Sequence, residues 1–371
     1  MRNPSLLLAI ALFSLTAACS GADQGARDER VGRQASAVQG GKLDTNKAHN
    51  FSVGIANRYG GVCSGTLIAP NLVLTARHCV VVPDGNDAVS CSDKFGKSVQ
   101  PNALFVTTEP NLFRAKNYYA ATEIITPTAT NFCGNDIAIV ILEQNIPDSE
   151  AEPATPVVQF KMTDESKIGG TVTAMGYGIT SPTANDSGQR RIRENIGILC
   201  IPGSPTLECE GQLARFSDSP AEFITEGYVC SGDSGGGAFD QKSFTNGSPY
   251  VLGALSRGPQ TESKCLAAIY SRTDAHADMI IEAGNKAAEQ GGYPAPNWTK
   301  PLNADGSEPT ADEPCEGDIC TDTSATEPAP ATTTTTTTTG CSSAPAGTSG
   351  NPTALVALAA AALLVGARRR R

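Results

Sequence analysis

An all-β domain, either a barrel or a sandwich, is the fold class that this sequence predicts for residues 38 to about 270. Short β-branched or apolar runs recur there between turn signals, a spacing typical of antiparallel strands. Residues 275–288 form the one good helical candidate, and Asp274 is placed to cap it. The expected strands are residues 52–56, 66–69, 72–74, 137–142, 170–175, 250–255 and 266–270.

Charge and cysteine content narrow the class of protein. The 371 residues carry a net charge of -10, which argues against a nucleic-acid partner because such a partner requires a basic surface. Twelve cysteines are many for a reduced cytosolic protein and favour an oxidising compartment. The length allows two or three domains, or one large β domain with tails.

The N-terminus indicates export. An arginine precedes an apolar run at residues 6–15, and small residues follow, which is the layout of a signal peptide. The segment Leu-Thr-Ala-Ala-Cys that ends at Cys19 partly resembles a bacterial lipoprotein box. Two outcomes therefore remain open: lipidation of Cys19, or plain signal cleavage near Ala18 or Ala22.

The composition changes after residue 290. Residues 291–340 are rich in proline, threonine and acidic residues and have little with which to build a core. We therefore expect a disordered stalk rather than a domain. Cys315 and Cys320 are expected to close a small loop within it.

The C-terminal segment, residues 341–371, has the features of a surface anchor. It contains Cys341, a short apolar segment at residues 354–367 and four final arginines. This tail resembles the C-terminal sorting tags of bacterial surface proteins, particularly the myxobacterial type. The resemblance implies cleavage near Cys341 and retention at the surface through that residue, and the alternative is a simple membrane tail anchor.

A glycine-rich turn at residues 227–237 carries the serine on which the functional prediction depends. Glycines on both sides of Ser234 let the backbone approach a ligand closely. Such a turn can aim the amides of Gly232 and Ser234 at one point, where a developing oxyanion would sit. The motif Gly-Asp-Ser-Gly-Gly closely resembles the nucleophile loop of trypsin/chymotrypsin-like serine endopeptidases. That resemblance implies that a histidine and then an aspartate precede the serine.

Both partners occur in that order. His78 lies in Leu-Thr-Ala-Arg-His-Cys, which resembles the family's Thr-Ala-Ala-His-Cys with an arginine in place of the second alanine. Asp136 opens an apolar run and resembles the aspartate of the family's Asn-Asp-Ile-Ala-Leu-Leu. The buried run indicates that this carboxylate points inward, where it needs a partner such as His78. His49 and His276 have no comparable context, and we assign them no role.

The resemblance also implies the role of each residue. Ser234 is the expected nucleophile, and His78 removes its proton and returns it to the leaving amine. Asp136 stays ionised and fixes the imidazole tautomer. The amides of Gly232 and Ser234 form the expected oxyanion hole.

The start of the β domain predicts a zymogen. Val-Gln-Gly-Gly at residues 38–41 resembles the family's mature N-terminus, usually Ile-Val-Gly-Gly. Asp233, a carboxylate under a tight loop, needs a cation. We expect cleavage between Ala37 and Val38 to free an amine that pairs with Asp233 and forms the oxyanion hole. Ala37 is a small residue, so self-activation and activation by another protease both remain open.

The resemblance places the specificity residues by position. Tyr228 occupies the base of the primary specificity pocket, where trypsin-like members have an aspartate, so cleavage after Lys or Arg is not expected. Ser256 and Gly258 match the segment that pairs with the substrate backbone, and Arg257 departs from its usual aromatic residue. Ala268 is expected to line the pocket wall. We predict small or medium uncharged residues before the scissile bond, unless loop changes have moved the pocket.

Eight cysteines lie within the β domain. The family implies Cys63–Cys79 and Cys230–Cys265, Cys200–Cys209 is a plausible local pair, and Cys91–Cys133 then remains. No cofactor and no metal are expected. The acidic residues between the histidine and the aspartate, where some relatives bind calcium, are interpreted as a solvated loop. They are Asp84, Asp87 and Asp93.

By this resemblance, the domain consists of two packed six-stranded antiparallel β-barrels with a C-terminal helix and the active site in their cleft. The expected function is a secreted or surface-held serine endopeptidase of bacterial origin, acting on protein or peptide substrates. The alternative is a catalytically silent, protease-like binding module on a stalk. The predicted segments are a signal peptide, an activation propeptide, the protease domain, the stalk and the tail, at residues 1–19, 20–37, 38–290, 291–340 and 341–371.

Overall fold

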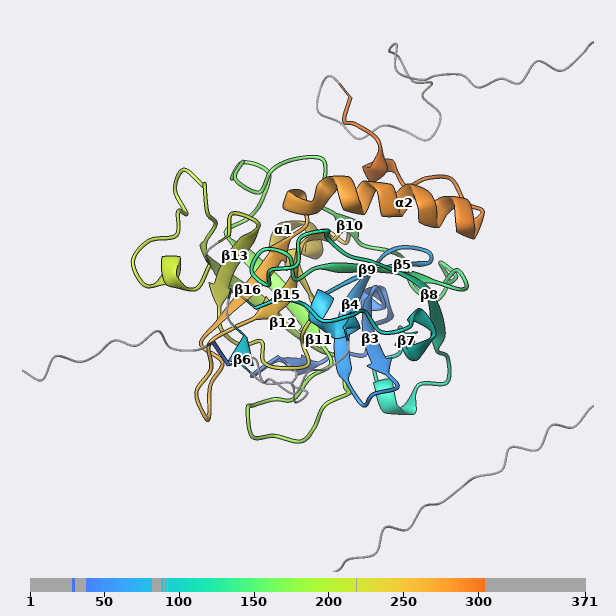
Figure 1. The fold of residues 1–371 in the computed structure, drawn as a ribbon, viewed down its shortest axis with the longest axis horizontal. Helices are drawn as coiled ribbons and strands as arrows, with labels where there is room; N and C mark the ends of the chain where they lie inside the picture. The colour runs from blue at the N-terminus through green and yellow to red at the C-terminus, as the bar shows by residue number, and fades with distance from the viewer. Residues whose placement is uncertain are drawn as a thin grey trace, which may run out of the picture. The chain divides into compact units, whose positions relative to one another are not determined.

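The expected chymotrypsin-like fold, two six-stranded antiparallel β-barrels with a C-terminal helix, is confirmed by the computed structural model (Figure 1). The structure describes residues 29–30, 38–81, 88–89, 91, 93–217 and 219–303. The predicted signal peptide, the stalk beyond residue 303 and the C-terminal tail lie outside these residues. Within the described part of the chain, no helix is long and apolar enough to cross a membrane.

The first barrel is a closed antiparallel sheet. Strand β9 is buried along its whole length, in keeping with its continuous apolar sequence. This strand begins two residues after Asp136 and pairs with β5, the strand that leads to His78. The barrel therefore brings the predicted histidine and aspartate to one place. Its strands, in spatial order, are β3 (Ser52–Asn57), β4 (Val62–Ala69), β5 (Leu72–Thr75), β9 (Ala138–Leu142), β8 (Tyr119–Ile125) and β7 (Leu104–Thr107).

The second barrel closes through pairing of β15 with β16. Its six strands, in spatial order, are β11 (Thr171–Gly176), β12 (Arg191–Cys200), β13 (Glu222–Glu226), β16 (Ala267–Arg272), β15 (Tyr250–Arg257) and β14 (Gly237–Asp240). Two short strands extend it, β2 (Lys42–Leu43) beside β12 and β10 (Thr155–Pro156) parallel to β15. The chain segment before β14 carries Ser234, so the predicted nucleophile comes from this barrel.

Two short strands lie outside the barrels, and a short helix follows the last strand described above. β1 (Glu29–Arg30) pairs antiparallel with β6 (Ala88–Val89). Helix α1 (Gln241–Thr245) follows β14 directly, and the Asp240 side chain caps it by accepting a hydrogen bond from the Ser243 N–H. This cap places the start of α1 at the end of a barrel strand.

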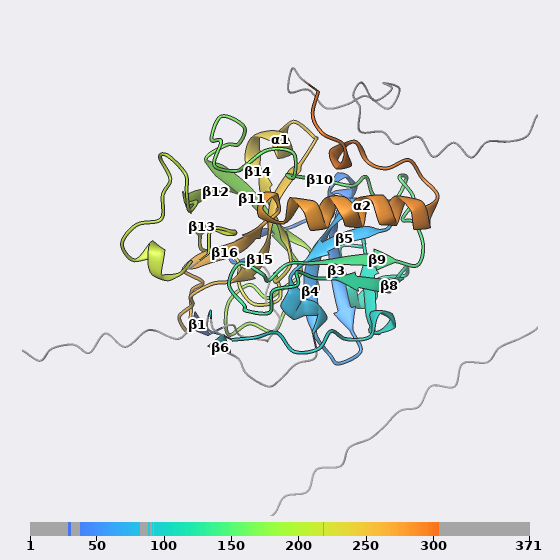
Figure 2. The same ribbon diagram turned by 45° about the horizontal axis from the view of Figure 1, so that its top comes forward.

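The predicted helix forms, but its cap differs from the prediction. A 3₁₀ turn, Asp274–His276, precedes helix α2 (Ala277–Gly291), which lies against the first barrel beside β4, β5 and β9 (Figure 2). Asp274 is not the cap, because its buried carboxylate instead pairs with Arg272 and accepts a hydrogen bond from the Met162 N–H. Gly292, with φ of +67°, ends the helix in the left-handed conformation that favours glycine.

The folded chain continues past residue 290, where the stalk was expected to begin. The chain's one tryptophan, Trp298, is buried in the first barrel's core cluster, which also includes residues of α2. It fits because Gly284 of α2 has no side chain: a Cβ there would lie 2.8 Å from Trp298 Cζ3 and closer still to Cη2 of the same ring. One large apolar contact therefore packs the start of the predicted stalk segment against the domain.

Candidate active site

His78 lies in a 3₁₀ turn (Arg77–Val80) that follows β5. A disulfide between Cys63 of β4 and Cys79 joins the turn to the neighbouring strand. Phe132 stacks against the imidazole, with 6.3 Å between ring centroids and 22° between ring planes. The ring of the predicted base is therefore bordered by an aromatic side chain, and its turn is fixed covalently.

Asp136 is fully buried and has three hydrogen-bond donors. Its Oδ1 accepts the backbone N–H of His78 at 2.8 Å, and its Oδ2 lies 2.7 Å from His78 Nδ1. The Ser256 hydroxyl donates to the same Oδ2 at 2.6 Å. Three donors fix the orientation of this buried carboxylate. Because Asp136 engages Nδ1, the other imidazole nitrogen, Nε2, is left to act on a substrate or nucleophile.

Ser234 reaches this place because its loop docks on the first barrel. The Ser64 N–H of β4 donates to the Ser234 carbonyl at 2.8 Å, and the Ser64 hydroxyl donates to the Gly232 carbonyl at 3.0 Å. Gly235 has φ of +80°, and a Cβ there would lie 2.8 Å from the Ala76 nitrogen. Only glycine accommodates both the left-handed backbone and this close approach.

The two amides predicted to bind an oxyanion make no hydrogen bond within the described residues. Gly232 has φ of +91°, again in the region that favours glycine. Within the described residues, neither the Gly232 N–H nor the Ser234 N–H donates a hydrogen bond to the protein. The Ser234 residue is 7% exposed. Two unused donors beside a nearly buried serine are suited to bind a developing negative charge.

Asp233 points away from this site into the protein. Its carboxylate accepts hydrogen bonds from the backbone N–H groups of Cys230 at 3.1 Å and Gly178 at 3.3 Å, and from that of Val38. Burial raises the pKa of the Asp233 carboxyl well above its ordinary value, while these hydrogen bonds act in the opposite direction. Val38 is fully buried. The structure thus brings the predicted activation pair together.

A small cavity of about 20 Å³ lies beside Ser234. Ser256 and Gly258 line it, in agreement with their predicted place on the substrate-binding strand. Tyr228 and Ala268 are not among its lining residues. The Tyr228 ring instead stacks on the Arg193 guanidinium, 3.4 Å from the ring centroid, and Ala268 is fully buried in β16. The lining is Val229, Cys230, Ser231, Ser234, Leu255, Ser256, Arg257, Gly258, Gln260 and Cys265.

Four disulfides form among the described residues, and they have the four pairings set out above. Cys230–Cys265 spans the cavity beside Ser234, since both residues line it. Cys91–Cys133 joins the segment after His78 to the loop before Asp136. Cys63 and Cys79 lie near His78 in a grouping that resembles a metal site, but their sulfurs bond to each other and are not available as ligands. Asp93 is exposed, and Asp84 and Asp87 lie outside the described residues.

Several residues near the site make contacts that the sequence did not predict. Arg77 replaces the family's alanine, stacks over Phe95 at 4.5 Å and donates to the carbonyls of Pro127 and Ala129. His276, which received no role, has its Nε2 2.8 Å from the Gly134 carbonyl, two residues before Asp136. Glu222 is buried in β13 and accepts the Gly134 N–H. Their partners are distant in sequence, so only the fold brings these contacts together.

The two barrels, the buried Asp136 bonded to His78 and the docked serine loop define the class of protein: a serine endopeptidase, which is a hydrolase. The chain belongs to the Trypsin family, whose profile matches residues 38–280. Its substrates are therefore proteins or peptides.

Comparison with individual proteins agrees with this family. The chain is 25% identical over 258 residues to a trypsin of Saccharopolyspora erythraea, covering 68% of this chain and 100% of the relative. It is 28% identical over 266 residues to snake venom serine protease 1 of Craspedocephalus gramineus, covering 68% and 89%. It is 24% identical over 237 residues to phenoloxidase-activating factor 3 of Holotrichia diomphalia, covering 59% of this chain and 62% of that relative.

Proposed function

We propose that this chain is an exported serine endopeptidase that cleaves peptide bonds with a triad of Ser234, His78 and Asp136. The observation that carries the proposal is the 2.7 Å contact between Asp136 Oδ2 and His78 Nδ1 beneath a serine loop with two unused amides. This arrangement leaves His78 Nε2 as the nitrogen that serves Ser234.

The proposed reaction has two halves. In acylation, Ser234 Oγ bonds to the peptide carbonyl carbon while His78 Nε2 takes its proton, and the Gly232 and Ser234 amides stabilise the oxyanion. His78 then gives the proton to the leaving amine as the C–N bond breaks. In deacylation, water attacks the ester, His78 takes its proton and returns it to Ser234 Oγ, and the carboxylic acid product leaves. Asp136 stays ionised throughout and stabilises the imidazolium.

The direct test is peptide hydrolysis by the processed enzyme and by its Ser234→Ala variant. The proposal predicts cleavage by the wild-type protein and a loss of at least about 10³-fold in kcat for the variant, because the triad acts as a unit. Equal rates for the two proteins would refute it. No cleavage by either, with the disulfides and N-terminus verified, would favour the alternative of a silent binding module.

We propose further that the enzyme is made as a zymogen that is cleaved between Ala37 and Val38. The buried Val38, the buried Asp233 carboxylate and its raised pKa support this, because a free amine at Val38 would supply a cation in direct contact with the carboxylate. A processed form with one extra residue before Val38 should be inactive. Full activity of that form would contradict the proposal. Activated enzyme mixed with Ser234→Ala zymogen distinguishes the two routes of activation. Cleavage of the zymogen after Ala37 indicates self-activation, and an uncut zymogen indicates that another protease is required.

The proposed preference is for small or medium uncharged residues before the scissile bond. The small volume of the cavity and the position of Tyr228, stacked on Arg193 rather than lining it, support this. Profiling with a peptide library distinguishes this preference from cleavage after Lys or Arg.

Export is consistent with four disulfides, and we propose retention at a bacterial surface through the C-terminal tail. Surface retention predicts that removal of residues 341–371 releases the enzyme into the medium.

A further inference from the structure

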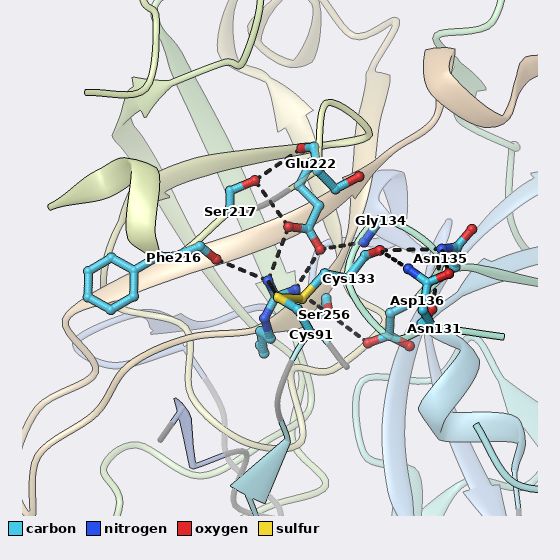
Figure 3. Close-up of a disulfide and its surroundings, with 12 residues drawn as sticks. Cys91, Asn131, Cys133, Gly134, Asn135, Asp136, Phe216, Ser217, Glu222 and Ser256 are labelled. Atoms are coloured by element: carbon cyan, nitrogen blue, oxygen red, sulfur yellow. Dashed lines mark hydrogen bonds and ion pairs between the residues drawn. A yellow bond between two sulfur atoms is a disulfide. The ribbon is translucent and has the colours of Figure 1, made fainter. Parts of the chain in front are cut away.

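A buried ion pair joins Arg257, at the end of β15, to Glu222, at the start of β13. Figure 3 shows Glu222 in the same cluster of side chains as Ser256 and the proposed catalytic Asp136. Arg257 Nη1 is 2.6 Å from Glu222 Oε1, and Nη2 is 3.1 Å from Oε2. Both side chains are 0% exposed. The guanidinium therefore points into the protein. It replaces the aromatic residue that the family usually has at this position, and its two bonds to the carboxylate fix its orientation.

Glu222 connects this pair to the first barrel. Its Oε1 also accepts the Gly134 N–H at 2.7 Å, and its Oε2 accepts the Ser217 hydroxyl at 3.1 Å (Figure 3). Arg257 Nη2 donates in addition to the Phe216 carbonyl at 3.0 Å. A fully partnered buried pair is rigid, whereas loss of one partner leaves an uncompensated charge.

Gly134 is held from both sides, two residues before Asp136. The Glu222 carboxylate binds its N–H, and the His276 Nε2 lies 2.8 Å from its carbonyl. Its φ of +77° favours glycine, and a Cβ at this position would lie only 2.7 Å from the Cβ of Ser219. Both features require glycine here. The loop before Asp136 is thus fixed by two residues of the second half of the chain.

Arg257 is linked to Asp136 through the neighbouring Ser256. Ser256 precedes Arg257 in β15, and its hydroxyl donates to Asp136 Oδ2 at 2.6 Å. Arg257 Nη1 lies 3.4 Å from that hydroxyl oxygen. One ion pair therefore supports two separate attachments of Asp136 to the second barrel: the Ser256 hydroxyl and the Gly134 backbone.

We infer that Glu222 and Arg257 are positioning residues that hold the two halves of the triad in register. His78 and Asp136 come from the first barrel and Ser234 comes from the second, so their alignment depends on contacts between the barrels. The pair supplies such a contact at the aspartate. The inference rests on the proposed function, because it assumes that Ser234, His78 and Asp136 act together.

The test compares Glu222→Gln with a matched control, Asp44→Asn, in active enzyme prepared from the full chain. Asp44 Oδ2 binds the buried Arg190 Nε at 2.8 Å, so this is also a buried carboxylate–guanidinium pair. Its partners among the described residues, Asn46, His49 and Arg190, lie outside the loop before Asp136. The readouts are kcat and KM for a peptide substrate, the rate of Ser234 labelling by a fluorophosphonate, and the melting temperature.

Below the melting transition, Glu222→Gln should lower kcat and the labelling rate tenfold or more while KM stays within threefold. Asp44→Asn should leave kcat and the labelling rate within twofold of wild type, even where its melting temperature falls. A folded Glu222→Gln enzyme with both rates within twofold of wild type would overturn the inference. An equal loss of both rates in the two variants would also overturn it, because the effect would then be general destabilisation.

A second variant covers a failure of Glu222→Gln to fold. Glu222→Leu with Arg257→Met removes both charges, and such replacement of a buried ion pair is often neutral in stability. The folded double variant should still lose at least tenfold in kcat, because Gly134 has lost its carboxylate acceptor. Wild-type kcat in the double variant would show that the pair is only structural. A wild-type enzyme that the probe does not label would instead refute the proposed function.

Discussion

Replacing Gly235 with alanine tests how the proposed nucleophile loop is held against the first barrel. Its φ of +80° costs a non-glycine residue roughly 1–2 kcal/mol. The new Cβ would lie 2.8 Å from the Ala76 nitrogen and closer still to the Thr75 hydroxyl and Ser64 carbonyl. Because two of these three atoms belong to backbone that cannot rotate away, overpacking adds roughly 1–3 kcal/mol. The total is about 2–5 kcal/mol by these two estimates.

Gly247 is the matched control for this substitution. It has the same φ of +80°, but a Cβ there would meet nothing within 4 Å. Gly247→Ala should therefore lose only the backbone part, roughly 1–2 kcal/mol. The assay is urea unfolding with the disulfides intact, together with the fluorophosphonate labelling rate of each folded variant.

We expect Gly235→Ala to be the less stable variant by roughly 1–3 kcal/mol and to label at least tenfold more slowly, because its loop is displaced from Ser64. Gly247→Ala should label at the wild-type rate. Equal unfolding free energies and equal labelling rates in the two variants would refute the view that the serine loop docks on β4.

Three further predictions follow from the same contacts. Burial lowers the pKa of His276 in the folded state below its unfolded value, so the free energy of unfolding should fall as pH drops below about 6.5. In chemical unfolding, His276→Gln should lose less stability than wild type between pH 7 and 5. An equal loss in the two proteins would contradict this prediction. Replacing Cys63 and Cys79 together with serine opens a bridge between residues 16 apart and should cost about 3 kcal/mol in urea unfolding, whereas an unchanged midpoint would rule this out. Ser256→Ala removes one of the three donors to Asp136. We expect kcat/KM to fall about tenfold or more, because a hydrogen bond to a buried charge is lost. A kcat/KM within twofold of wild type would show that two donors suffice.

Much of the fold was predictable because its signals are local. The continuous apolar run of β9 and the short runs of β3, β5 and β15 mark buried strands, and the sequence around His78 and Ser234 carries the family motifs. Five barrel strands are not among those expected from the sequence: β7, β8, β12, β13 and β14. In β8 and β12, exposed or half-buried residues interrupt the apolar pattern. Tertiary pairing, rather than local sequence preference, determines such strands.

The candidate site was predictable only where its residues lie in motifs. Asp136 and His78 meet as expected, but the attachments around them involve Glu222 and His276, which are far apart in sequence from Gly134. A buried glutamate looks like any surface glutamate when its partner is unknown. Tyr228 shows the other limit: with φ of +98°, it stacks on Arg193 and does not line the cavity, which counting from Ser234 could not reveal.

The most direct test of the central claim is covalent labelling of the processed enzyme, beginning at Val38, with a fluorophosphonate probe and mass-spectrometric location of the adduct. The account predicts one label per molecule on Ser234 and none in Ser234→Ala, because only a serine activated by His78 reacts at an appreciable rate. An unlabelled Ser234, in a protein whose N-terminus and four disulfides have been verified, would contradict the proposed triad.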